Sequence, residues 1–302
     1  MKFSKINGLG LAAALAALAG CATAPPPSRP HAHQTAPAPA AAPADRALAA
    51  QAGAFEGFMR HASGIDAAFS GPGEVAQALQ TGAAYEPKDL EAGLIAYAAM
   101  AALQEPGFVA AVRAAPREQV RRLAADPEAA LALPGAQAAA ARANAALQRR
   151  GEALADAGLR VKKAAYAVQR QPWSRGRAPD ARATLSQVRA ASGYQRRSDD
   201  AVQLAAAVSE PGRRGGPSPV VTRGVALAAL TVLGQDGGAY ALMAEPRSGM
   251  CLRMAKLNFH QCLASAGTHY ENIYCLGTHA MAETGQCVMD ATRPARARLA
   301  AN

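Results

Sequence analysis

The chain has 302 residues, of which 50% are hydrophobic and only 5% aromatic, and it carries a formal net charge of +10 at pH 7. That length supplies one large hydrophobic core or two modest ones. Alanine dominates and β-branched residues are scarce, and Ala and Leu are the best helix formers, so the composition argues against a mainly β-sheet protein and predicts an all-α fold.

The first twenty residues predict an export signal. Lys2 and Lys5 precede an apolar run from Leu9 to Ala19, which is shorter than the roughly 20 residues needed to cross a bilayer. The run ends in Leu18-Ala19-Gly20-Cys21, which resembles the lipobox of bacterial lipoproteins. The resemblance covers residues 1–21 and implies that residues 1–20 are a lipoprotein signal peptide. It also implies that Cys21 carries a diacylglycerol on its sulfur and an acyl chain such as palmitate on its amino group.

The same resemblance implies where the protein is located. Two or more acyl chains hold a protein stably at a bilayer, so a membrane is the first expected partner. The residue after the cysteine is Ala22, and not the Asp that holds members of this family in the inner membrane. This implies the outer membrane, with the protein facing the periplasm. An ordinary signal peptide cleaved at another bond is the alternative interpretation.

Residues 21–45 are rich in proline and alanine and predict an extended tether between the membrane and the folded part. An irregular, alanine-rich helical domain is expected from residue 46 to residue 210. Proline suits the first turn of a helix, so helices are expected to start near each of four prolines. These are Pro87, Pro106, Pro116 and Pro127.

The longest helix is expected within Gly135–Gln171. Apolar residues recur there every seven positions, at Leu147, Leu154, Val161 and Val168. Such a ladder faces either the protein's own core or a coiled-coil partner. Gly151 and Gly158 weaken the helix, and Gly158 is a point where it could break. The next segment, Pro172–Pro179, contains the only tryptophan and is predicted to be a loop.

A segment rich in glycine, proline and arginine at 211–219 predicts a linker and a soft domain boundary. A C-terminal helical module is expected over residues 220–290, followed by a tail at 291–302. Its first helix is expected over 220–234, with Thr222 as the N-terminal cap.

This module contains four cysteines, Cys251, Cys262, Cys275 and Cys287, within 37 residues. An even number of cysteines in an exported chain predicts two disulfides. The helices expected over Pro246–Ala266 and Tyr270–Glu283 form an antiparallel hairpin. Of the three pairings, the hairpin favours the nested one, with Cys262 bonded to Cys275 near the turn and Cys251 bonded to Cys287 at the open end. On one continuous helix Cys275 and Cys287 would face different directions, so Gly285 is expected to end the second helix.

Two other interpretations of this module remain open. His260, His269 and His279 lie among the cysteines, so a zinc site competes with the disulfides, as does a pair of reactive redox thiols. No two ligands show the spacing of a structural zinc site, and we therefore predict no metal and no cofactor. The segments Cys251–Cys262 and Tyr274–Ala280 resemble a part of uncharacterised exported proteins of α-proteobacteria, and this resemblance implies no activity.

Positive charge is concentrated between Ala136 and Arg197, where 13 lysines or arginines accompany three acidic residues. In a cell envelope such a block predicts contact with anionic lipid headgroups, with other anionic envelope components or with another envelope protein. Nucleic acid is not an expected partner of an exported protein, and a merely solvated helix surface is the alternative. The candidate anion contacts are Arg149, Arg150, Arg160, Lys162, Lys163 and Arg170.

No catalytic motif is present: G-x-S-x-G, S-x-x-K with its partners, H-E-x-x-H and a phosphate-binding glycine loop are all absent. We therefore predict a structural or adaptor protein of the envelope in preference to an enzyme. His61 with Asp66, or Glu56, are the side chains considered for an active site. A helical enzyme acting on the cell wall is the first alternative and requires a buried catalytic acid. A periplasmic metal or redox protein that uses the Cys/His cluster is the second. The sequence does not determine the oligomeric state.

Overall fold

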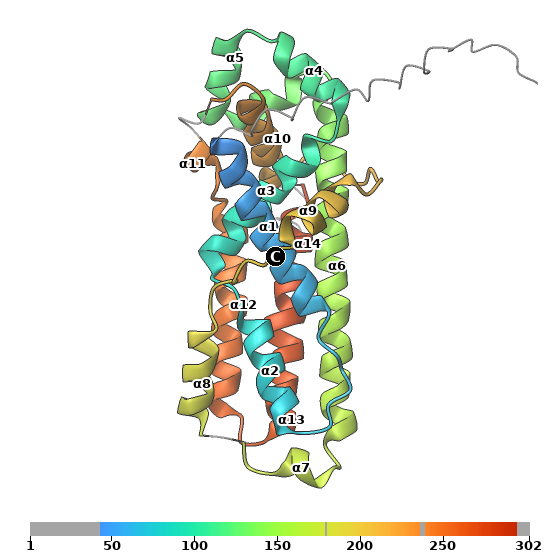
Figure 1. The fold of residues 1–302 in the computed structure, drawn as a ribbon, viewed down its shortest axis with the longest axis vertical. Coiled ribbons are helices and arrows are strands. Elements are labelled where there is room, and N and C mark those ends of the chain that lie inside the picture. The colour runs from blue at the N-terminus through green and yellow to red at the C-terminus, as the bar shows by residue number, and fades with distance from the viewer. Residues whose placement is uncertain (1–42, 179, 236–238, 295–302) are drawn as a thin grey trace, which may run out of the picture. The chain divides into compact units, whose positions relative to one another are not determined.

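The computed structural model describes residues 43–178, 180–235 and 239–294, with side chains from residue 46 onward. Every named element in these ranges is helical, which confirms the all-α prediction (Figure 1). The predicted signal peptide, Cys21 and the tether as far as residue 42 lie outside the described residues, as do residues 295–302 of the predicted tail. The helices are α1 (Pro43–Ser63), α2 (Pro72–Ala83), α3 (Pro87–Ala102), α4 (Pro106–Ala114), α5 (Arg117–Arg121), α6 (Ala136–Val168), α7 (Pro172–Arg175), α8 (Ala181–Ala190), α9 (Asp200–Ser209), α10 (Pro219–Val232), α11 (Ala239–Leu242), α12 (Pro246–Ser265), α13 (His269–Cys275) and α14 (Thr284–Ala291), with the 3₁₀-helices η1 (Arg122–Ala124) and η2 (Pro127–Ala132) and the π-helix η4 (Leu276–Glu283).

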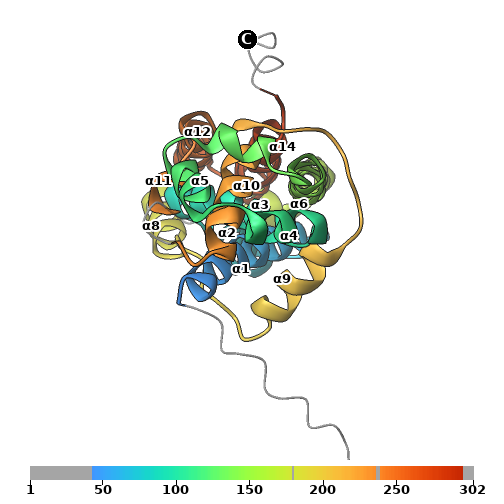
Figure 2. The same cartoon turned by 90° about the horizontal axis from the view of Figure 1, so that it is seen from above.

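The described residues all belong to one compact unit. In a view from above, α3 and α10 lie inside a ring that includes α1, α6, α12 and α14 (Figure 2). The helices before and after residues 211–219, which were predicted to be a linker, therefore share one core. Hydrogen bonds hold this segment against α6: Asn144 Nδ2 donates to Gly216 O at 2.8 Å, and Arg214 donates from its backbone N to Ala141 O and from its guanidinium to Glu152 Oε1, both at 3.2 Å.

The centre of this unit is α3, which is buried on nearly all sides. Its Tyr97 packs on Phe55 of α1 with ring centroids 5.1 Å apart, and Tyr85, just before α3, packs on Phe58 at 4.8 Å. Among the described residues, no single helix is both long and apolar enough to cross a bilayer. By length and composition alone α3 and α4 pass that test together, and they meet at an angle of 91°.

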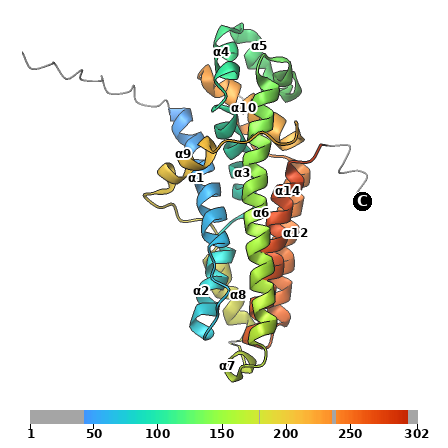
Figure 3. The ribbon, with the colours of Figure 1, turned by 90° about the vertical axis from the view of Figure 1, so that its right-hand side faces the viewer.

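The longest helix, α6, extends beside α1, α3, α13, η4 and α14 (Figure 3). The four ladder residues from Leu147 to Val168 are all buried in the protein's own core. The helix is unbroken through Gly151 and Gly158, so the expectation that Gly158 could break it is wrong. Tertiary packing outweighs the roughly 1 kcal/mol by which a glycine disfavours a helix interior.

The two glycines of α6 face Gly277 and Gly285 on the opposite helix, and we call these four residues the glycine seam. A Cβ at Gly158 would lie 2.5 Å from Ala282 N and 2.6 Å from Gly277 O. A Cβ at Gly285 would lie 2.5 Å from Ala155 N and 2.7 Å from Gly151 O. Since the backbones of the two helices touch along this seam, a residue larger than glycine does not fit.

The C-terminal hairpin pairs α12 with a second arm made of α13, η4 and α14. Two nested disulfides join the arms, as predicted. The inner disulfide links Cys262 to Cys275 with Cα atoms 5.6 Å apart, and the outer disulfide links Cys251 to Cys287 with Cα atoms 5.7 Å apart. Both disulfides therefore connect helix to helix along the length of the hairpin.

Gly285 does not end the second arm, contrary to the prediction, because α14 continues through it to Ala291. A helix end at Gly285 was expected to bring Cys287 onto the same side as Cys275, and the π-helix η4 achieves this alignment instead. Twelve residues of α-helix make about three and a third turns, which would leave Cys287 roughly a third of a turn away from Cys275. Each π-turn takes more residues than an α-turn, and the eight residues of η4 remove that excess rotation.

Most helix starts agree with the prediction. Proline occupies the first turn of α3, α4 and η2, and Pro116 is the N-cap of α5. Thr222 does not cap α10; the helix begins at Pro219, so its N-cap is Ser218, four positions before Thr222, and the Ser218 hydroxyl accepts a hydrogen bond from Val221 N. Within the segment predicted to be a loop, residues 172–175 form the short helix α7.

Candidate functional site

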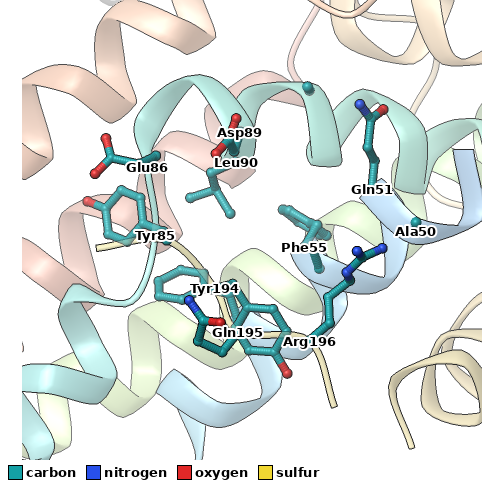
Figure 4. Close-up of a pocket in the computed structure, with 14 residues that line it drawn as sticks. Ala50, Gln51, Phe55, Tyr85, Glu86, Asp89, Leu90, Tyr194, Gln195 and Arg196 are labelled. Carbon is teal, nitrogen blue, oxygen red and sulfur yellow. The ribbon is translucent and has the colours of Figure 1, made fainter. Parts of the chain in front are cut away.

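A cavity of about 290 Å³ lies between α1, the start of α3 and the segment that leads into α9 (Figure 4). Its apolar lining comes mainly from Phe55, Phe58, Tyr85, Leu90 and Tyr194. Small-molecule sites are typically concave, apolar and at least about 300 Å³ in volume, with a few polar groups that orient the ligand. The cavity is at the small end of that range.

Charged side chains of both signs surround this cavity. Glu86 is the N-cap of α3, Asp89 lies in its first turn, Arg196 belongs to the segment before α9, and all three are exposed. In Figure 4, Glu86 and Arg196 lie on opposite sides of the apolar centre formed by Leu90 and Phe55. Within the described part of the chain, none of the three lies within 4.0 Å of an opposite charge. All three charges are therefore available to a ligand.

Lys256 of α12 holds two walls of the cavity together from behind. Its Nζ donates hydrogen bonds to Ala83 O and Tyr85 O, both at 2.7 Å, and to Ser192 Oγ at 3.0 Å. It also lies 4.4 Å from the centroid of the Tyr85 ring. Burial lowers the pKa of the Lys256 ammonium to about 8. The connection between α2 and α3 is thereby joined to the connection between α8 and α9.

Lys256 was not among the predicted site residues, although the sequence carries a signal for it. Leu252, Lys256, Phe259 and Leu263 follow the spacing of one helix face, and the other three are apolar and buried. A lysine at a core position of an amphipathic helix indicates a buried cation that needs acceptors. Those acceptors lie more than 60 positions away in the chain, so only the fold identifies them.

Tyr194 is fixed in the cavity wall by its hydroxyl group. The hydroxyl donates to Asp200 Oδ1 at 2.9 Å and lies 3.1 Å from His61 Nδ1. Burial, followed by the hydrogen bond to Asp200, raises the pKa of Tyr194. The ring covers Gly57 of α1, where there is no space for a side chain. His61 thus contacts Tyr194 and Gly57 O, and these bonds anchor a wall residue.

Glu56 is the buried acid that an enzyme of the cell wall would require, but its position does not suit that role. It is 1% exposed, and Arg150 Nε donates to its Oε2 at 2.6 Å. Burial raises the pKa of the Glu56 carboxyl to about 7, against the opposing effect of Arg150. The residue lines neither the cavity of Figure 4 nor the neighbouring ones that contain His61 or Gln235. Its arrangement is that of an interior ion pair between α1 and α6.

The structure divides the six candidate anion contacts into two groups. Arg149 and Arg150 form ion pairs, Arg149 with Glu210 at 3.0 Å and Arg150 with Glu56 at 2.6 Å. Of the four others, Arg160, Lys162 and Lys163 lie on the second half of α6, and Arg170 lies two residues after its end. Of these, Lys162 is partly buried, with Nζ 5.2 Å from the Tyr274 ring centroid, and the remaining three are exposed.

Each of the three histidines of the C-terminal module has different neighbours. His269 packs against Trp173, and His279 Nδ1 lies 2.8 Å from Glu283 Oε1. His260 Nε2 is buried with no hydrogen-bond partner in the described residues, and burial lowers the pKa of the His260 imidazole. In the ranges that the structure describes, no three His, Cys, Asp or Glu side chains gather as metal ligands do.

Comparison of the chain with protein-family models, curated proteins and solved structures found no match.

Proposed function

We propose that the protein is a lipoprotein anchored through Cys21 in the outer membrane, facing the periplasm, with a structural or adaptor role. In this role the second half of α6 contacts an anionic component of the envelope. One observation carries the proposal: an exposed face of α6 that combines unpaired cations with large apolar side chains. We call Leu159, Arg160, Lys163, Tyr166 and Arg170 the α6 cationic face.

The geometry of the helix brings these residues together. Leu159, Lys163 and Tyr166 are spaced by four and three positions, which places them on one side of α6, and Arg170 follows in the turn directly after the helix. Arg160 lies beside them. Leu159 and Tyr166 are 57% and 60% exposed, so this face presents apolar as well as cationic side chains. Among the described residues no carboxylate lies within ion-pair distance of Arg160, Lys163 or Arg170.

This combination favours a membrane surface as the anionic partner. A basic residue near an anionic bilayer contributes about 1 kcal/mol, so three such residues give a binding energy that salt weakens. Tyr and Leu side chains add contact with the region between headgroups and acyl chains. A lipid on Cys21 would keep this face near a bilayer, and weak contacts then suffice because the effective concentration is high.

The test measures vesicle binding by an unlipidated chain that starts at residue 21 with Cys21→Ser. Arg160→Gln, Lys163→Gln and Arg170→Gln are combined in one variant. The matched control removes three exposed arginines elsewhere, with Arg113→Gln, Arg117→Gln and Arg247→Gln.

We expect the starting chain and the control to sediment with vesicles that contain anionic phospholipid, and the α6 variant to remain in solution. Binding should also disappear in about 0.5 M salt, where the Debye length falls to a few Å. Equal binding by the α6 variant and the control, or binding that is insensitive to salt, would show that this face is not the contact.

Two further measurements test the remaining parts of the proposal. The intact mass of protein extracted from membranes should show an acylated N-terminus at Cys21; an unmodified N-terminus would contradict the anchor. Incubation with purified cell wall between about pH 5 and pH 8 should release no soluble fragments, because Glu56 opens to none of the cavities described above. Release of such fragments would favour the enzyme alternative.

A further inference from the structure

We propose that the cavity of Figure 4 binds a free α-amino acid with an apolar side chain, held as a zwitterion. The proposal is independent of the membrane contact of α6, because the cavity is formed by α1, α3 and residues 193–196. It rests on four properties of the cavity: two unpaired acids, one unpaired cation, an apolar centre and rigid walls.

The charges around the cavity match the two ends of a zwitterion. Glu86 and Asp89 offer carboxylates to an ammonium group, and Arg196 offers a guanidinium that can bind a carboxylate through two parallel hydrogen bonds. Figure 4 shows Glu86 and Arg196 on opposite sides of the apolar centre, so one ligand can reach both. A ligand with a single charge leaves one of these groups unused.

The apolar centre selects the side chain and limits its size. Phe55, Phe58, Leu90 and Tyr194 supply aromatic and aliphatic surface that favours a leucine-like or phenylalanine-like side chain. A volume of about 290 Å³ suits a ligand with on the order of ten non-hydrogen atoms. It does not suit a long peptide or a sugar chain.

One amide side chain in the cavity wall has an oxygen without a partner among the described residues. Gln51 lines the cavity, and its Oε1 is buried with no hydrogen-bond partner in the part of the chain that the structure describes. A buried acceptor without a partner costs free energy that a ligand N–H can recover. Gln51 also lines the adjacent cavity beside α10 and α11, so it stands at the boundary between the two.

The walls are held in place before any ligand arrives. Lys256 joins the segment 83–85 to Ser192, and Tyr194 is fixed through Asp200. A site whose walls are already ordered loses less conformational entropy on binding, which raises affinity for a small ligand. This rigidity distinguishes the cavity from a groove between loosely packed surface chains.

The test uses isothermal titration of the purified full-length mature chain with three probes that share a phenyl group. L-Phenylalanine carries both charges, phenethylamine only the ammonium, and 3-phenylpropionate only the carboxylate. We expect L-phenylalanine to bind at least tenfold more tightly than either of the others, since each lacks one charge-assisted contact. Equal affinity for phenethylamine and L-phenylalanine, or no binding by any probe, would overturn the proposal.

Two variants locate the binding in this cavity. Arg196→Gln should weaken L-phenylalanine binding at least tenfold and leave phenethylamine binding unchanged. The matched control is Arg197→Gln, because Arg197 is the next residue, is also exposed, and lines a different cavity. The control should stay within twofold of the starting protein. If both variants weaken binding to the same extent, the carboxylate is not held by Arg196 and the assignment fails.

Discussion

Replacement of Gly158 by alanine tests whether tertiary packing outweighs local helix preference, because the two effects change stability in opposite directions at this position. In the middle of a helix, Gly→Ala is expected to stabilise by about 1 kcal/mol. At Gly158 the added Cβ would lie 2.5 Å from Ala282 N and 2.6 Å from Gly277 O, whereas ordinary contacts begin near 3.4 Å. The two helices must therefore separate by about 0.9 Å, and backbone atoms cannot rotate aside as a side chain can.

Overpacking of a core costs about 1–3 kcal/mol, and the rigidity of two backbones places this site in the upper part of that range. After the helix preference of about 1 kcal/mol is subtracted, we expect Gly158→Ala to lower the free energy of unfolding by about 1–2 kcal/mol. The measurement is urea unfolding followed by circular dichroism at 222 nm, with both disulfides intact.

The control is Gly73→Ala in α2, where a Cβ meets nothing within 4 Å. This change should leave stability unchanged or raise it by up to about 1 kcal/mol, because only the helix preference acts. If Gly158→Ala stabilises the protein as much as Gly73→Ala does, the close approach of the two helices along the glycine seam is refuted.

Three other perturbations test the disulfides and the buried charges. The outer and inner disulfides close loops of 36 and 13 residues. In the chain-entropy model, replacing the outer pair by alanine should lower the free energy of unfolding by about 3.8 kcal/mol and replacing the inner pair by about 2.9 kcal/mol, with the difference reduced by nesting. Urea unfolding should therefore not show a larger loss of stability for the inner-pair variant. Lys256→Met leaves three acceptors unsatisfied and should destabilise by about 1–3 kcal/mol at pH 7. In the starting protein the pKa of Lys256 is about 8, below the ordinary 10.5, so the unfolded chain binds more protons than the folded chain between these pH values. The stability of the starting protein should therefore rise from pH 8 to pH 10.5. Thermal unfolding of the Lys256→Met variant should not show this rise. Burial raises the pKa of the Glu56 carboxyl from 4.5 to about 7, so the folded state holds the proton more tightly than the unfolded state, and stability should fall as the pH rises from about 5 to 7. Glu56→Gln should remove that part of the pH dependence. An unchanged slope of stability against pH in this variant would contradict the burial of the acid.

The candidate site was only partly predictable. The concentration of cations in α6 is a property of composition, and three of the six candidates, Arg160, Lys163 and Arg170, are exposed and unpaired in the described structure. Arg150 was indistinguishable from them in the sequence. Its partner Glu56 lies 94 positions away, so the ion pair depends on how α1 and α6 pack. The cavity of Figure 4 was not predicted, because its walls come from three separated segments.

Several features follow from the sequence by itself, because they depend on local stereochemistry. Proline lacks an amide hydrogen and has a fixed φ, so it indicates the first turn of α3, α4 and η2. The seven-residue ladder of α6 identifies its buried side through helix periodicity alone. Periodicity placed Cys251 and Cys262 on one side of α12, and the hairpin then favoured the nested pairing that the structure has, although the helix end expected at Gly285 is absent.

Other features were decided only by the tertiary structure, because they depend on atoms that the chain brings together from a distance. A glycine appears in a sequence as a helix breaker, whereas Gly158 is required by the backbone of Gly277 against it. The π-turns of η4 have no sequence signal that we recognised, and they align Cys275 with Cys287 within one continuous arm. Lys256 depends on carbonyl groups of another segment for its place in the core. Local preferences thus determined which residues form helices, while contacts between distant backbones determined how those helices meet.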